Sequence, residues 1–209
     1  MEFLYEIYNS TSANGFVDFK KKVTAELEKN LKYPLRAYQK EALGRYLHYK
    51  EDTKNRLSPE HVLFNMATGS GKTLLLASLI LEKYQQGERN FIFFVNNENI
   101  LTKTRDNFLT AGASKYLFAE KIVLNNQVVP VREVTDFSDS NPNAINIVFT
   151  TIQKLHQDLN IPRENRLSYE QFEDISVVLL ADEAHHLNAG LNAREKKDNN
   201  SWTSTIENI

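Results

Sequence analysis

Short apolar runs alternate with amphipathic stretches along this chain. Four runs are rich in β-branched and aromatic residues and too continuously apolar for strands with one exposed face, so they predict strands buried on both faces: 61–66, 91–95, 145–150 and 176–182. Between and before them, apolar positions recur near a 3.6-residue period and predict helices over 37–50, 73–86, 98–111 and 152–159. Strands that alternate with helices predict an α/β fold with a mostly parallel sheet, flanked by helices on both sides.

Local signals refine this pattern. Pro34 stands where a helix can start, and Gly87 is well placed to end the helix over 73–86. Residues 121–134 predict a further strand or a hairpin that turns at Asn125-Asn126. The polar run 188–200 predicts a mobile surface loop, and 201–209 begins an amphipathic helical pattern that stops at the last residue. We therefore expect a fragment of a longer protein.

Composition narrows the class of protein. The 209 residues are 41% hydrophobic and 25% charged, with 25 basic against 27 acidic side chains, so a bulk basic tail for nucleic acid is excluded. The absence of cysteine excludes disulfide scaffolds, thiolate zinc sites and cysteine nucleophiles. The longest apolar run, 74–81, falls far short of the ~20 residues of a membrane span, and Glu2 stands where a signal peptide carries basic charge. We expect a cytoplasmic protein with no membrane association.

A glycine-rich phosphate loop is the strongest motif. Residues 66–73 read Met-Ala-Thr-Gly-Ser-Gly-Lys-Thr, between a predicted buried strand and a predicted helix. Glycines let backbone N–H groups approach phosphate oxygens, and the helix that follows offers unpaired amides and the positive end of its dipole. Lys72 can reach the β- and γ-phosphates of a nucleotide, and the Thr73 hydroxyl can coordinate Mg²⁺. The predicted phosphate-binding residues are Thr68, Gly69, Ser70, Gly71, Lys72 and Thr73.

A second motif ends the last predicted strand. Residues 177–183, Val-Val-Leu-Leu-Ala-Asp-Glu, place two carboxylates at the carboxyl edge of a parallel sheet, where α/β folds bind ligands. Asp182 is predicted to hold Mg²⁺, and Glu183 to orient or deprotonate an attacking water. Two alternatives stay open: the acids only form surface ion pairs, or they hold a transition metal with His185 and His186. Adjacent histidines rarely face one ion, which disfavours the metal. Together the two motifs predict hydrolysis of ATP with Mg²⁺.

The residues of these motifs resemble the motifs of a known protein family. Residues 67–73 and the Asp-Glu-Ala-His run at 182–185 resemble the first motor domain of superfamily-two helicases and translocases. Four sequence motifs are similar to those of the restriction subunit of type III restriction–modification enzymes. They are Leu-Arg-Ala-Tyr-Gln at 35–39, the Met-Ala-Thr form of the phosphate loop, Thr-Thr-Ile-Gln at 150–153, and the run 180–188. The strict pattern has glycine where this chain has Met66.

The resemblance implies roles for further residues. Gln39 would read the adenine edge, with Arg36 and Tyr38 supporting the base; the alternative is an exposed glutamine on an amphipathic helix. His185 would couple the ATP site to motifs beyond this chain. The residues that would contact a nucleic-acid phosphate backbone are Asn96, Asn97, Thr150 and Thr151. The Asn-Asn wording departs from the usual Pro-Thr form, and a Thr-Thr pair is otherwise an ordinary strand end.

The resemblance also implies an organisation and partners. We expect an N-terminal extension over 1–34 and, over 35–209, a first RecA-like P-loop NTPase domain that is truncated before the strand following the Asp182 strand. In this fold that later strand lies between the strands leading to Lys72 and to Asp182, so its slot would stay empty. Implied partners are double-stranded DNA, a second RecA-like domain and a nuclease domain beyond residue 209, and a modification (methyltransferase) subunit.

Rival functions remain at this point. A P-loop ATPase that drives protein remodelling or transport would use the same two motifs without nucleic acid, and the slightly acidic composition is compatible with it. Type I restriction motors and related defence helicases have similar sequence motifs. A nucleotide-gated binding module without catalysis is disfavoured by Glu183, because modules that only bind ATP commonly lack that general base.

Overall fold

The structure, a computed structural model, describes residues 4–13, 17–161, 166–182, 205–206 and 209. The helices are α1 (Leu4–Ala13), the 3₁₀ helix η1 (Phe19–Lys22), α2 (Ala25–Lys29), α3 (Ala37–Glu51), α4 (Lys72–Gln85), α5 (Glu98–Leu109), α6 (Ile152–Asn160) and α7 (Tyr169–Glu173). The strands are β1 (Asn90–Val95), β2 (Val123–Leu124), β3 (Gln127–Val128), β4 (Val131–Glu133), β5 (Ile145–Thr151) and β6 (Val177–Ala181).

A parallel sheet forms the centre of the molecule. Its strand order is β4-β5-β1-β6, and every neighbouring pair is parallel. Phe93 in β1 lies beside Phe149 of β5 and Leu180 of β6. Every residue of β1 and β5 is buried, as the continuous apolar runs predicted. The predicted α/β fold with a mostly parallel, helix-flanked sheet is confirmed.

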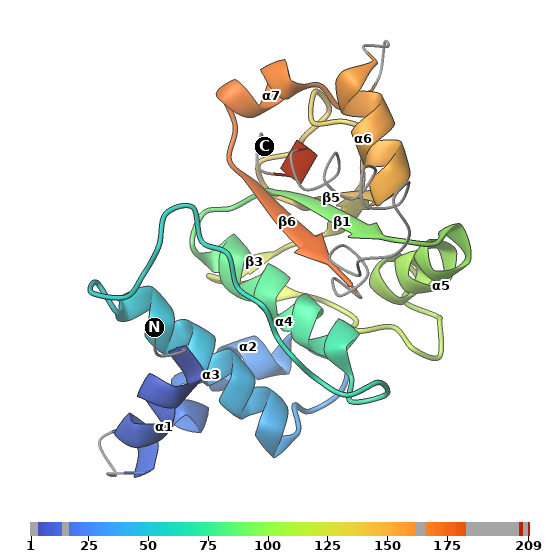
Figure 1. The fold of residues 1–209 in the computed structure, drawn as a ribbon. Helices are drawn as coiled ribbons and strands as arrows, with labels where there is room; N and C mark the ends of the chain where they lie inside the picture. Colours follow the sequence, from blue (N-terminus) through green and yellow to red (C-terminus); the bar gives the residue numbers. More distant parts are fainter. Residues whose placement is uncertain (1–3, 14–16, 162–165, 183–204, 207–208) are drawn as a thin grey trace.

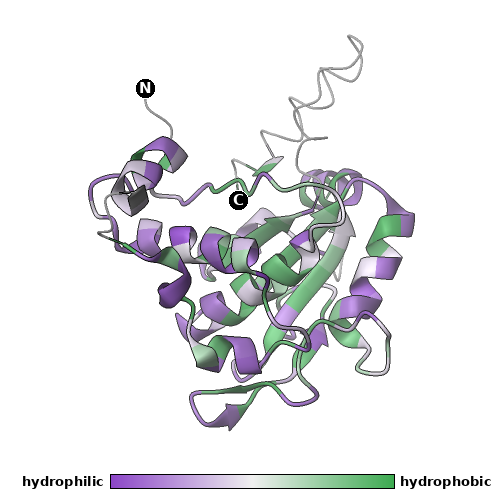
Figure 2. Cartoon of the chain, turned by 90° about the horizontal axis from the view of Figure 1, so that it is seen from below, coloured by the Kyte–Doolittle hydropathy of each residue, from purple (hydrophilic) through white to green (hydrophobic). Residues whose placement is uncertain are grey.

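The two faces of the sheet are covered by different helices. Alternate residues of a strand point to opposite faces, so Phe91 and Phe93 join one hydrophobic cluster with residues of α3, α4 and α5. Ile92 and Phe94 join a second cluster with residues of α6 and α7. Figure 2 shows hydrophobic strands in the middle of the molecule and helices at its periphery, with hydrophilic residues on the helices.

Local signals also predicted the ends of elements well. The helix expected over 73–86 is α4, and Gly87 follows it with φ 106° while its N–H donates to the Tyr84 carbonyl. The expected hairpin forms from β2 and β3, with Asn125 at φ 52° and Asn126 at φ 61° in the turn. Positive φ at both turn positions suits asparagine and matches the twist of a two-residue hairpin.

The strand predicted over 61–66 does not form. These residues have no strand or helix assignment, and they pair with no strand in the part of the chain that the structure describes. Phe64 and Met66 are half-buried against the hydrophobic cluster that contains residues of α3, α4 and α5, whereas Leu63 is 77% exposed. Apolar alternation favours an extended backbone, but a strand also needs a neighbour that receives its N–H and C=O bonds. Within the described residues β6 ends the sheet, and nothing pairs with its outer edge.

The N-terminal residues pack into the same cluster as α3 and α4. Phe19 and Leu27 are buried, and a Cβ added at Gly44 in α3 would lie 1.9 Å from the Phe19 carbonyl oxygen. Glycine at this position therefore lets η1 approach α3 closely. Among the described residues no helix has the length and apolar character needed to cross a membrane.

Candidate nucleotide-binding site

The phosphate loop opens helix α4. Gly69 and Gly71 have φ of 76° and 83°, in the left-handed region that favours glycine. Gly71 is the N-cap of α4, so Lys72 and Thr73 are the first two residues of a 14-residue helix. The Ser70 N–H donates to the Ala67 carbonyl at 3.2 Å and closes a tight turn. The loop thus presents amides and the positive end of the α4 dipole at one place, as an anion site requires.

Space and polarity at the loop fit a phosphate chain. Nothing lies within 4 Å of the position that a Cβ would take on Gly69, and Thr68 and Gly69 are exposed. The Ser70 hydroxyl is buried without a hydrogen-bond partner in the part of the chain described. Lys72 supplies a cation, and Thr73 supplies the hard oxygen that Mg²⁺ prefers.

Side chains at the start of helix α3 are hydrogen-bonded to the phosphate loop. Gln39 is 2% exposed, and its Nε2 donates to the carbonyls of Ser70 and Gly71, each at 3.1 Å. Its Oε1 accepts from the Arg36 backbone N–H at 2.8 Å. The Tyr38 hydroxyl donates to the Ser70 carbonyl at 2.7 Å and accepts from Arg36 Nη1 at 3.1 Å. Gln39 and Tyr38 therefore contact the phosphate loop directly, and Arg36 contacts it through the Tyr38 hydroxyl. Gln39 is not the exposed glutamine of the alternative interpretation.

Asp182 lies at the carboxyl edge of the sheet. Its backbone N–H donates to the Phe94 carbonyl at 3.2 Å, which continues the β1–β6 ladder one residue beyond β6. Helix α4 leads into β1 through only four residues, so the start of α4 and the end of β1 face the same side of the molecule. Figure 1 shows β1 and β6 pointing toward that side. Glu183 and His185, like His186, lie outside the described residues.

The four predicted nucleic-acid residues lie at this edge too, because Phe94 is level with Thr150 and Val95 with Thr151. Their side chains form hydrogen bonds with other residues of this chain. Asn97 caps α5 by accepting from the Asn99 N–H, and Thr151 caps α6 by accepting from the Lys154 N–H. The two other side chains are hydrogen-bonded as well. The buried Thr150 hydroxyl donates to the Thr151 carbonyl, and Asn96 Oδ1 accepts from Gln153 Nε2 at 2.9 Å.

A polar cluster anchors the segment that leads into the phosphate loop. The Glu60 carboxylate accepts from Lys83 Nζ at 2.9 Å and from the Tyr46 hydroxyl at 3.3 Å. All three side chains are largely buried between α3, α4 and the segment. Further along, the Phe64 ring lies 6.2 Å from the Tyr46 ring, edge to face. Segment 60–66 is therefore held by side chains of α3 and α4 rather than by sheet hydrogen bonds.

This cluster shifts the pKa of each member. Burial raises the pKa of Tyr46 to about 12. Burial alone would raise the pKa of Glu60, but the hydrogen bond and charge of Lys83, together with the Tyr46 hydrogen bond and the charge of Lys50, outweigh it and lower that pKa. Burial alone would lower the pKa of Lys83, and its bonds to Tyr46 and Glu60 reverse the direction. Sequence reasoning missed this cluster, since Glu60 and Lys83 are 23 residues apart and no local pattern joins them.

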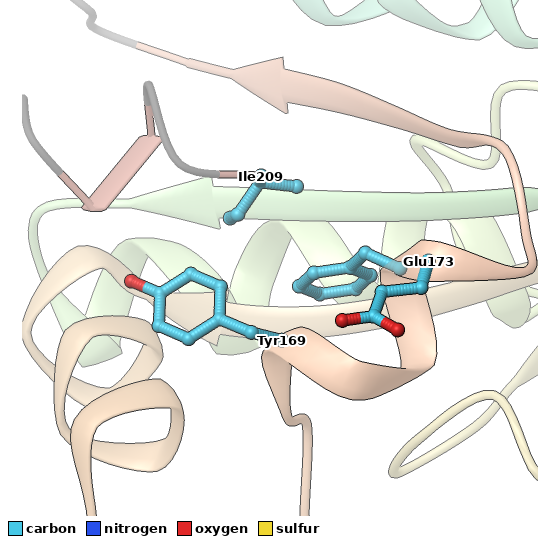
Figure 3. Close-up of a pocket in the computed structure, with 4 residues that line it drawn as sticks. Tyr169, Glu173 and Ile209 are labelled. Carbon is cyan, nitrogen blue, oxygen red and sulfur yellow. The ribbon is translucent and has the colours of Figure 1, made fainter.

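A separate hollow lies on the other face of the sheet. It has a volume of about 390 Å³ and is lined by Tyr169, Phe172, Glu173 and Ile209. Figure 3 shows Tyr169 and Glu173, which belong to α7, together with Ile209. None of them belongs to a predicted site motif, and the hollow contains no residue of the phosphate loop.

Comparison with known proteins agrees with the motifs. A family model described as the res subunit of type III restriction enzymes matches residues 32–209. The probable type III restriction-modification enzyme HindVIP Res subunit of Haemophilus influenzae is 43% identical over 195 residues. The match covers 87% of this chain and 37% of that protein, so the chain spans well under half the length of this relative. No solved structure matches.

The family match begins just before the Leu-Arg-Ala-Tyr-Gln run, and it includes both the phosphate loop and strand β6 with the Asp182 that follows it. It covers far more than half of the chain. The chain belongs to the family of type III restriction enzyme res subunits.

Proposed function

We propose that this chain is the ATP-binding part of a DNA motor in a type III restriction enzyme, in which ATP hydrolysis drives movement along double-stranded DNA. The observation that carries the proposal is the phosphate loop: two glycines at positive φ open a 14-residue helix whose first residues are Lys72 and Thr73. A loop of this shape binds a phosphate chain through amides, the helix dipole and a lysine.

Each residue of the site has a stated task in this proposal. Lys72 holds the terminal phosphates and offsets negative charge on the transferred phosphoryl group. Thr73 and Asp182 would hold Mg²⁺, which supplies charge neutralisation on the phosphate oxygens when bound. Glu183 orients or deprotonates the attacking water.

The rest of the enzyme is also a proposal. The relative from Haemophilus influenzae is named as a subunit of a restriction-modification enzyme, which supports a modification subunit as partner. A second RecA-like domain would close on the ATP site, and a nuclease domain would cut DNA. Contacts to the DNA backbone would come from the edge that carries Asn96, Asn97, Thr150 and Thr151. Because the side chains of Asn97 and Thr151 cap helices, backbone amides at the starts of α5 and α6 are the groups we assign to phosphate contact there.

Equilibrium titration with a fluorescent ATP analogue and Mg²⁺ tests the ATP site. The wild-type chain should bind the analogue, and Lys72→Ala should weaken binding by at least about tenfold, since a charge-assisted contact to phosphate is lost. Lys115→Ala, which removes an exposed lysine after α5, is the matched control and should bind as the wild type does. Equal affinity of the Lys72→Ala and wild-type chains would overturn the assignment.

ATP hydrolysis by the intact enzyme tests the DNA motor. Duplex DNA should stimulate the rate, and Glu183→Gln should abolish hydrolysis while ATP still binds. A rate that no nucleic acid changes would favour the rival, a P-loop ATPase acting on proteins.

A further inference from the structure

A second hollow lies where η1 and the start of α2 meet α3 and α4. It has a volume of about 360 Å³. Three of its residues come from α3, one from α4, one from η1 and one from the N-cap of α2. They are Leu47, Lys50, Glu51, Glu82, Lys22 and Thr24. None of them belongs to the phosphate loop or to another predicted site motif.

The amine of Lys50 is held loosely at the wall of this hollow. Its side chain is 19% exposed, and its Nζ lies 3.7 Å from Glu82 Oε1, which is too far for a good hydrogen bond. The same oxygen accepts from Gln86 Nε2 at 2.6 Å, so it is already engaged by a closer donor. The Lys50–Glu82 ion pair is therefore a weak one.

Two neighbouring lysines are held much more firmly. Lys83 has the same side-chain exposure of 19%, but its Nζ donates to the Glu60 carboxylate at 2.9 Å. Lys22 lines the same hollow as Lys50 and donates to Glu51 at 2.6 Å. A lysine becomes a nucleophile only as the neutral amine, and a short ion pair keeps it protonated. Of these three lysines, Lys50 is thus the one whose contacts favour the neutral form.

The electrostatic surroundings of Lys50 act in the same direction. Burial lowers the pKa of Lys50, and it outweighs the attraction of Glu82. The nearby charge of Lys83 also lowers that pKa, while the charge of Glu60 opposes the change. The pKa of Lys83 is raised instead, because its bonds to Tyr46 and Glu60 outweigh its burial. Near neutral pH the neutral amine is therefore more populated at Lys50 than at Lys83.

We propose that Lys50 is a modification site, at which the side-chain amine takes an acyl group from a small acyl phosphate that enters the hollow from solvent. The neutral Nζ attacks the carbonyl carbon and forms a C–N bond. The C–O bond to phosphate breaks, phosphate leaves with that electron pair, and the amine gives up one proton to water. The product is an uncharged amide, so Glu82 loses its cationic neighbour between α3 and α4. The proposal uses no residue of the ATP site and does not depend on the proposed function.

Acetyl phosphate is the probe, and mass spectrometry follows acetylation of each lysine in the folded chain at pH 8. Lys50 should react at least about threefold faster than Lys115, an exposed lysine after α5, because more of its amine is neutral. Lys83 should react at least about threefold more slowly than Lys115, although its exposure equals that of Lys50. In urea that unfolds the chain, the three lysines should react at similar rates.

A charge variant tests the cause of the reactivity. Glu82→Gln removes the charge that favours the ammonium form, so Lys50 should be acetylated faster than in the wild type. Glu120→Gln is the matched control, because it neutralises an exposed carboxylate that does not line the hollow, and it should leave the Lys50 rate unchanged. Equal rates at Lys50 and Lys115 in the folded chain would overturn the proposal. A Lys50 rate that Glu82→Gln does not raise, or a Lys50 advantage that persists in urea, would also overturn it.

Discussion

Strand β1 and segment 60–66 both run between helices, yet different forces hold them. Every residue of β1 is buried, and the strand is bonded on both sides, to β5 and to β6. Segment 60–66 has no strand beside it within the described residues, and it is held by an ion pair, a tyrosine hydroxyl and two half-buried apolar side chains. The sheet is therefore stabilised mainly by apolar burial, whereas the approach to the phosphate loop depends on polar contacts with α3 and α4.

Truncation of Phe93 should have the largest effect. Phe93 is fully buried in β1, with ring centroids 5.4 Å from Phe108 and 5.7 Å from Phe149. Phe93→Ala removes these contacts and leaves a cavity, so we expect the free energy of unfolding to fall by about 3–5 kcal/mol. Urea denaturation followed by circular dichroism measures it. A loss below about 1 kcal/mol would mean that the strand is less tightly packed than its contacts indicate.

Removing the Lys83 cation should have an intermediate effect. Lys83→Met keeps most of the apolar stem but removes the cation that donates to the largely buried Glu60 carboxylate at 2.9 Å. The Tyr46 hydroxyl, the Arg56 Nε at 3.9 Å and the charge of Lys50 remain near that carboxylate. We expect a loss of about 1–2 kcal/mol in the free energy of unfolding.

A double-mutant cycle attributes that loss to the pair. In Lys83→Met/Glu60→Gln the uncompensated carboxylate is gone, so the double variant should be at least as stable as Lys83→Met alone. Strictly additive losses would show that the two side chains do not interact.

How far the sequence predicts this molecule depends on the range of the contacts involved. Continuous apolar runs predicted β1, β5 and β6, and an apolar helical period followed by glycine predicted α4 to within one residue at each end. Those features are local. The strand over 61–66 was wrong because pairing depends on a neighbour, which periodicity cannot supply.

The site divides in the same way. The order Gly-Ser-Gly-Lys-Thr before an apolar helix predicted a phosphate loop, and both glycines there have the positive φ that such a tight turn needs. The direction of the Gln39 amide could not be predicted, since its loop partners are 31 and 32 residues away and packing decides which way it turns. The roles assigned to Lys72, Asp182 and Glu183 stay predictions.

A smaller effect is expected from acid. The folded-state pKa of Glu60 is lowered, so its contribution to stability is complete above the ordinary glutamate pKa of about 4.3 and is lost as pH falls through the folded-state value. The wild-type chain should therefore lose stability more steeply than Glu60→Gln as the pH falls below about 4. Thermal melts from pH 7 down to pH 3 compare the two slopes, and parallel curves would contradict the shift.

The smallest effect is expected at Leu63, and it tests the comparison most directly. Leu63 lies in the segment that resembles a buried strand in sequence, but its side chain is 77% exposed. Leu63→Ala therefore removes little apolar contact and should change the free energy of unfolding by no more than about 0.5 kcal/mol. Met66→Ala, at a half-buried position of the same segment, should cost more. If Leu63→Ala instead destabilised the chain as Phe93→Ala does, the segment would be packed in solution like a central strand, and polar anchoring would no longer distinguish the two regions.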